Sequence, residues 1–328
     1  MKIKCTAGGT MGNILNLIDE NMDGNSWEDL CVQCYRMRYQ NDNYTLVPAS
    51  NGGDAGIEGF THSGVVHQCY YPERDYDVDK LYDHQRNKVT HDIQKLLDNG
   101  DRFKELGVPV IKEWHFNVPE YKDTRILKHL TNKEAEVLRA KKDDPDKYSY
   151  ISDSFRIIIK IAADFIPEIS QIIRNNVNAM RIDLGSCTDK EPDWSKCDSQ
   201  KSANIQRKIT AVMHTTSEDT AAQYVIGTFI EAYINGLEQM GALRINFPEI
   251  HHDLCRLEQS SKKDVSIKTH MNTDRTLNQK LFNDVLDNFE KRLQGDFSDV
   301  FTQPTIDDLK RDLVASWLAD CSMEFRSE

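Results

Sequence analysis

The chain has 328 residues, with 41 Lys and Arg against 53 Asp and Glu, so its formal net charge is −12. Hydrophobic residues make up 39% of the sequence and charged residues 29%, which excludes collagen-like, low-complexity and wholly disordered proteins. The excess of acid argues against a uniformly basic nucleic-acid binder, so contact with DNA would require a local basic surface or a partner that supplies one.

The sequence carries no pattern typical of membrane insertion or secretion. No run approaches the ~20 apolar residues that a membrane helix needs, and the first nine residues do not resemble a signal peptide. The eight cysteines are scattered along the chain, which favours reduced thiols over a disulfide framework. We therefore expect a cytoplasmic protein that does not associate with membranes.

The first half of the chain alternates between helical and strand patterns. We expect a helix over residues 26–40 with Ser26 as its N-cap, then a short strand over 44–47 and a glycine-rich turn over 48–56. The pattern continues with strands over 57–61 and 65–71 joined by a tight hairpin, a helix over 77–98, a strand over 108–118, a helix over 122–140 and a strand over 155–162.

The second half of the chain is mainly helical. Residues 183–202 have no periodicity and predict a linker or surface loop. Helices are expected over residues 203–215, 218–240, 248–259, 276–293 and 304–321. We therefore predict an α/β domain over residues 1–165, followed by a helical, partner-binding C-terminal region over residues 166–328.

Two acidic residues flank the glycine-rich turn that leads into the central hairpin. Side chains two positions apart share a face of a strand, so Gln68 and Tyr70 point the same way, and the hairpin sets Glu58 across from them. Asp54, Glu58 and Gln68 therefore converge as oxygen ligands of the kind that Mg²⁺ prefers. From spacing alone, an ordinary hairpin with solvated acids beside its glycines explains the same residues and is the commoner case.

The order of these residues resembles the restriction-endonuclease-like PD-(D/E)xK nucleases, most closely the Mrr-like branch and the nuclease domains of anti-phage effectors. The resemblance covers residues 26–118 and implies a core of helix, three strands, helix and strand. It implies Mg²⁺ or Mn²⁺ as cofactor, with Glu58 and Gln68 as metal ligands. Asp54 falls on the first acid of the loop, and Glu28 falls on the acid of the opening helix.

Tyr70 departs from the family pattern, because it stands where the resemblance implies a catalytic lysine. A tyrosine has a reference pKa near 10 and supplies a hydrogen bond but no positive charge. Lys88 and Lys80 in the following helix are candidate replacements, although a polar stripe on a helix is ordinarily a solvated face. Either the role of the lysine has moved, or this copy is inactive or weakly active.

A basic segment follows the predicted core. Residues 122–142 hold seven Lys and Arg against three acids, a local charge of +4. Such a helix would bind phosphate backbones, and a solvated amphipathic helix is an equally good interpretation. The candidate DNA-binding residues are Lys122, Arg125, Lys128, Lys133 and Arg139.

Other motifs point more simply to packing. Cys31 and Cys34 form a single CxxC inside a predicted helix, which favours core packing because no second pair completes a zinc site. Cys187 and Cys197 lie in the irregular segment and are weak metal candidates. The helix around Trp317 forms a core face or a docking helix, and it resembles the tails of nuclease subunits in Lamassu-like ABC-three-component defence systems.

Two functions follow from these observations. The first is a metal-dependent DNA endonuclease that acts on double-stranded DNA as the effector of an anti-phage or anti-plasmid complex. Such a complex would include protein partners, among them an SMC-like ATPase, and the chain itself would be a candidate homo-oligomer. The alternative is a catalytically impaired nuclease-fold subunit that binds DNA or scaffolds a partner.

Overall fold

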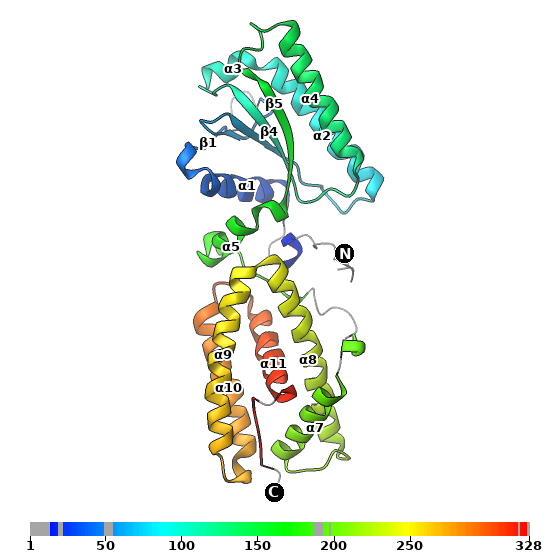
Figure 1. The fold of residues 1–328 in the computed structure, drawn as a ribbon, viewed down its shortest axis with the longest axis vertical. Helices are drawn as coiled ribbons and strands as arrows, with labels where there is room; N and C mark the ends of the chain where they lie inside the picture. The colour runs from blue at the N-terminus through cyan, green and yellow to red at the C-terminus, as the bar shows by residue number, and fades with distance from the viewer. Residues whose placement is uncertain are drawn as a thin grey trace. The chain divides into compact units, whose positions relative to one another are not determined.

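The structure is a computed structural model that describes residues 14–18, 22–48, 55–185, 193–196, 198–320 and 322–326. The chain divides into two compact units (Figure 1). The α/β unit comprises residues 13–15 and 21–169, and the helical unit comprises residues 1–12, 16–20 and 170–328. The division therefore falls between Ile169 and Ser170, a few residues beyond the position that the sequence indicates.

The α/β unit contains a five-stranded mixed sheet. Its elements are α1 (Gly24–Arg38), β1 (Thr45–Leu46), β2 (Gly59–Phe60), β3 (Val65–Cys69), α2 (Val78–Asp98), α3 (Gly100–Glu105), β4 (Ile111–Val118), α4 (Arg125–Asp143) and β5 (Ile151–Ile161), and α5 (Ile166–Arg174) runs across the boundary. The strand order is β1-β2-β3-β4-β5, antiparallel from β1 to β3 and parallel from β3 to β5. Helix, three strands, helix and strand thus follow one another as predicted, with the short α3 added before β4.

Helices cover both faces of this sheet (Figure 1). In the β3–β4 register, Val66 lies opposite Trp114, and both belong to the core that the apolar sides of α2 and α4 complete. His67 and His115 are the next pair along and point to the other face, because successive side chains alternate. Tyr35 of α1 packs on that face, with its ring stacked 4.1 Å from the His67 ring.

The N-terminus of α1 differs from its prediction. Asp23, not Ser26, is the N-cap: its carboxylate accepts a hydrogen bond of 2.9 Å from the backbone N–H of Ser26. The prediction of Ser26 was wrong because both residue types are good caps, and the earlier one starts the helix. Trp27, Cys31 and Tyr35 then recur at helical spacing and are buried.

The helical unit is built around its last helix. Its helices are α7 (Ser199–Met213), α8 (Thr220–Asn246), α9 (Pro248–Met271), α10 (Asn278–Phe297) and α11 (Gln303–Ala319). Helix α11 packs against α7, α8 and α10, and Trp317 is fully buried, which confirms the predicted core face. No helix in the described ranges is both long enough and apolar enough to cross a membrane. Cys187 and Cys197 lie outside the described residues.

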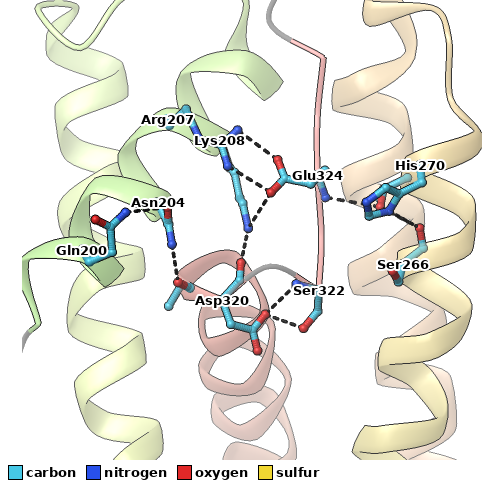
Figure 2. A network of polar contacts seen from close by, with 11 residues as sticks. Gln200, Asn204, Arg207, Lys208, Ser266, His270, Asp320, Ser322 and Glu324 are labelled. Atoms are coloured by element: carbon cyan, nitrogen blue, oxygen red, sulfur yellow. Dashed lines mark hydrogen bonds and ion pairs between the residues drawn. The ribbon is translucent and has the colours of Figure 1, made fainter.

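A buried lysine fastens the C-terminal segment to this unit (Figure 2). Lys208 of α7 is fully buried, and its ammonium group donates to the backbone carbonyl of Asp320. The same ammonium group lies 3.7 Å from the Glu324 carboxylate, which Arg207 also binds at 2.9 and 3.0 Å. Because Lys208 is buried and Arg207 is half exposed, the two cations contribute very differently to stability.

We predict that Lys208→Met lowers the free energy of unfolding by ~2–4 kcal/mol, because it removes one partner of a buried polar network. Arg207→Met is the matched control and should cost less than ~1 kcal/mol, since it breaks an exposed ion pair with the same glutamate. Chemical denaturation followed by circular dichroism measures both changes. Equal losses in the two variants would contradict the role assigned to Lys208.

Asp312 of α11 is a buried acid that forms no ion pair with any described residue. Its side chain is 3% exposed, and within the described part of the chain its Oδ2 has no hydrogen-bond partner. Burial raises the pKa of Asp312 to about 8, with Asp308 and Glu231 adding to the rise and Arg311 opposing it. The folded protein therefore holds a proton at Asp312 that the unfolded chain releases near its ordinary pKa of 3.8.

This difference makes the folded state less stable as the pH rises between about 4 and 8, because the unfolded chain gains stability by losing the proton. We predict that Asp312→Asn removes this contribution, so that its stability relative to the wild type rises by about 3–4 kcal/mol between pH 5 and pH 8. Denaturation curves of both proteins at the two pH values give the difference directly. A constant gap between the two proteins would show that Asp312 ionises normally.

Candidate metal site and its surroundings

The hairpin of β2 and β3 positions the site. Gly59 lies opposite His67 in the register, so Glu58 comes across from Gln68. A Cβ atom at Gly59 would clash with the hydroxyl of Tyr44, whose ring passes over this point. The Tyr44 hydroxyl then reaches His67 Nε2 at 2.7 Å. The glycine after Glu58 is therefore required by the close approach of Tyr44.

Glu58 and Gln68 meet as the alternation of the strand predicted. The Nε2 atom of Gln68 donates to Oε1 of Glu58 over 2.9 Å, and both side chains are buried. The other carboxylate oxygen, Oε2 of Glu58, has no hydrogen bond of good geometry within the described part of the chain, although the Cys69 side chain is near enough to lower the pKa of Glu58. Oε2 lies 3.8 Å from Nδ1 of His67. A buried carboxylate with an oxygen that accepts no such hydrogen bond is chemically suited to bind a cation.

The charge state of Glu58 depends on its surroundings. Burial raises the pKa of Glu58 to about 8, and the negative charge of Glu28 in α1 raises it further, whereas the positive charge of Lys88 in α2 lowers it. Two of the residues that the sequence singled out, Glu28 and Lys88, are thus close enough to act on Glu58. Without a bound cation, Glu58 is largely protonated at neutral pH.

Lys88 and Lys80 occupy different environments. Lys88 is 28% exposed, and its ammonium group lies 3.0 Å from Oδ2 of the fully buried Asp92. Lys80 is 65% exposed and pairs with Asp77, the N-cap of α2. Lys88 therefore lies beside the inner side of α2, whereas Lys80 faces solvent at the start of the helix.

Tyr70 follows β3 and packs on the same face as Gln68. Its ring stacks on Phe116 with 6.4 Å between ring centroids. Burial raises the pKa of Tyr70 to about 12, with Tyr76 and Glu73 adding to the rise. The phenol stays neutral at physiological pH, so Tyr70 can donate a hydrogen bond but does not replace a lysine.

The remaining predicted residues are Asp54 and the five basic candidates for DNA binding. Asp54 lies outside the described residues. On α4 and the loop before it, three of the five basic candidates bind acids of the same chain. Lys122 pairs with Asp75 and Glu120, Arg125 with Asp79 and Asp123, and Lys133 with Glu136. Lys128 and Arg139 are exposed.

A second group of polar side chains lies on the α1 face of the sheet. His67 is fully buried, and burial lowers its pKa to about 3, so the ring is neutral. Nδ2 of Asn117 lies 3.2 Å from Nδ1 of His67 and 3.6 Å from Sγ of Cys69. The Tyr35 hydroxyl contacts Oδ1 of Asn117 at 3.1 Å and Nδ1 of His115 at 2.7 Å.

Glu58, His67 and Cys69 form a group that could hold a metal ion. Their ligand atoms all lie within 4.8 Å of one another, and all three residues are buried. His67 and Cys69 share one face of β3, and neither was predicted as a site residue. Cys31 is near enough to Cys69 for each side chain to affect the pKa of the other, but its Sγ is not among the ligand atoms that lie within 4.8 Å of one another. The helical spacing of Trp27, Cys31 and Tyr35 indicates the face from which Cys31 arrives.

Comparison with known proteins does not extend these observations. A scan against protein-family models finds no match. Searches of curated proteins and of solved structures also find none.

Asn117 provides a direct test of the buried network. We predict that Asn117→Ala lowers the free energy of unfolding by ~2–3 kcal/mol, because His67 and Tyr35 lose a buried partner. Asn87→Ala on the exposed side of α2 is the control and should change stability by less than ~0.5 kcal/mol. Urea denaturation measures both. An Asn117→Ala protein as stable as the control would show that the network contributes nothing.

Proposed function

We propose that the chain is a metal-dependent DNA endonuclease that hydrolyses phosphodiester bonds with Mg²⁺, or Mn²⁺, held by Glu58 and Gln68. The observation that carries this proposal is the 2.9 Å contact between Oε1 of Glu58 and the terminal amide of Gln68. Asp54 and Glu28 are the further acids proposed around the same ion, and Glu28 acts on the pKa of Glu58.

The distance between Oε1 of Glu58 and the terminal amide of Gln68 is the distance expected between two ligands of one small cation. Ligands at 2.0–2.1 Å in an octahedron lie ~2.9–3.0 Å from their neighbours. The oxygen and nitrogen of a glutamine amide exchange places by a half-turn of the group. In the absence of a cation the nitrogen faces Glu58, because two oxygens at this distance repel. A half-turn of the Gln68 amide would therefore bring its oxygen to the required position.

Mg²⁺ at this position would supply Lewis-acid polarisation of a phosphate oxygen and activation of water. The protein residues have separate tasks. Glu58 and Gln68 bind the cation, and the ammonium group of Lys88 supplies the positive charge that Tyr70 lacks. A preorganised cation is worth several kcal/mol where negative charge develops on a phosphate. Asp92, which pairs with Lys88 at 3.0 Å, holds the lysine side chain on this side of α2.

The proposed substrate is double-stranded DNA, and the proposed setting is an anti-phage or anti-plasmid complex. The internal pairing of three of the five basic candidates, Lys122, Arg125 and Lys133, reduces the positive charge that this segment presents to DNA. A chain with a net charge of −12 would then depend on a partner, such as an SMC-like ATPase, to bring DNA to the site. The helical unit is the proposed partner-binding region.

A second candidate function rests on Tyr70. Its hydroxyl stays neutral, with a pKa of about 12, so the position that resembles the catalytic lysine carries no charge. A subunit that keeps the fold but binds DNA or a partner without cleaving it would be consistent with this substitution. It predicts that the acids of the site are dispensable for assembly.

Plasmid cleavage by the purified full-length chain with Mg²⁺ or Mn²⁺ tests the two candidates, with and without its partner. Glu58→Gln should reduce the cleavage rate at least ~100-fold, because it removes the charge that binds the cation. It should still fold, since glutamine matches the neutral form of Glu58. Lys88→Met should reduce the rate ~10–100-fold, because it removes the positive charge that stabilises the phosphate.

Lys80→Met makes the same chemical change at an exposed position and should keep the rate within about twofold. Cleavage that survives Glu58→Gln, or that falls equally in both lysine variants, would contradict the proposed site. No cleavage under any metal condition, together with unchanged complex assembly after Glu58→Gln, would favour the non-catalytic subunit.

A further inference from the structure

The α1 face of the sheet gathers soft ligands beside the carboxylate. Glu58 has two oxygens that face different neighbours: Oε1 meets Gln68, and Oε2 meets His67. Nδ1 of His67 lies 3.8 Å from Oε2 and 3.9 Å from Sγ of Cys69. Magnesium prefers oxygen ligands, whereas imidazole and thiolate are ligands of zinc. The two sides of the Glu58 carboxylate therefore have different metal preferences.

We propose that the chain binds one structural zinc ion between Oε2 of Glu58, Nδ1 of His67 and Sγ of Cys69, with Sγ of Cys31 as the fourth ligand. This site is separate from the proposed magnesium site, because it uses the opposite carboxylate oxygen and the opposite face of the hairpin. It joins three parts of the α/β unit, namely α1, the start of β2, and β3.

The spacing of the ligand atoms suits a tetrahedral ion. Zinc bonds of ~2.0–2.3 Å place neighbouring ligand atoms ~3.3–3.8 Å apart. The separations of 3.8 and 3.9 Å around Nδ1 of His67 need to contract by only a few tenths of an ångström. The Cys31 side chain is near enough to Cys69 to affect its pKa but lies outside the group of ligand atoms within 4.8 Å of one another, so it must move toward the ion to become the fourth ligand.

Neighbouring residues are arranged as they are around metal ligands. A metal-bound histidine usually donates its other ring N–H to an oxygen, and Nε2 of His67 lies 2.7 Å from the Tyr44 hydroxyl. The Asn117 amide, 3.6 Å from Sγ of Cys69, is placed to donate to a thiolate there. When zinc binds, the thiols and the carboxyl group release their protons to solvent, and Nδ1 exchanges its contact with Asn117 for the metal.

Burial indicates a structural ion. Cys31, His67, Cys69 and Glu58 are 1%, 0%, 7% and 6% exposed. Catalytic zinc sites keep a position open to water, whereas structural sites are closed by protein ligands. The proposed ion therefore fastens α1 to the β2–β3 hairpin, and it takes no part in the proposed cleavage.

Metal analysis of the full-length chain, produced in zinc-supplemented medium and purified without chelating resin, tests the proposal. Inductively coupled plasma mass spectrometry should find about one zinc per chain. Cys69→Ser and His67→Asn should lose it, whereas Cys34→Ser should retain it. Cys34 is the matched control, because it is an equally buried cysteine one turn along α1. Chelation should lower the melting temperature of the wild type and of Cys34→Ser, since removal of a ligand that binds only the folded state destabilises it.

Cobalt provides a second readout that does not depend on the stability of a variant. The chelator-treated wild type, titrated with Co²⁺, should develop a thiolate-to-cobalt absorption band. The band should weaken in Cys31→Ser and stay unchanged in Cys34→Ser. A wild-type chain with less than about a tenth of a zinc per molecule and no cobalt band would overturn the proposal, as would zinc that persists in Cys69→Ser.

The zinc proposal and the nuclease proposal fail separately. Lys88→Met should retain its zinc while it loses cleavage. One zinc per chain without DNA cleavage would support the structural zinc site and contradict the nuclease proposal. DNA cleavage by a chain that contains no zinc would support the nuclease proposal and contradict the zinc site.

Discussion

The burial of the Glu58 carboxylate is the constraint on which the rest of the α/β unit depends. A carboxylate removed from water must be protonated or must meet compensating groups, and Glu58 lies between two sets of them. Gln68 and Lys88 lie on the side of α2, and His67 and Cys69 lie on the side of α1. The strand register holds this position, because a slip by one residue would exchange the two faces of β3. The hairpin thus presents one acid to two chemically different environments.

Parts of this arrangement could be predicted from the sequence. Strand alternation and the hairpin predicted that Glu58 would meet Gln68, since both rules act over a few residues. The proximity of Cys31 to Cys69 was missed, because nothing local connects a helix residue with a strand residue 38 positions later. The CxxC spacing grouped Cys31 with Cys34 and predicted core packing for both, although helical spacing turns Cys31 toward the sheet with Trp27 and Tyr35. The ends of helices could not be predicted to the residue. In α1 the N-cap is Asp23, three residues before the predicted Ser26.

The positive charge of residues 122–142 is a second feature that the sequence did not predict correctly. Counting charges along residues 122–142 gives a net +4, but the count omits acids that fold against the segment from elsewhere. Asp75 lies in the loop before α2 and binds Lys122. Asp79 lies in the first turn of α2 and binds Arg125. Such exposed pairs add little stability, yet they reduce the positive potential that a phosphate backbone would meet. A linear charge count therefore overestimates the attraction of this surface for DNA.

The close approach of Tyr44 to Gly59 has an evolutionary consequence. Any side chain at position 59 would displace the Tyr44 ring and so remove the oxygen that faces Nε2 of His67. Tyr44 and Gly59 are thus coupled positions, and a substitution at one is tolerated only when the other changes with it. Descendants of this sequence would be expected to keep both residues or to lose both together. Covariation of this pair would mark lineages in which the orientation of His67 is under selection.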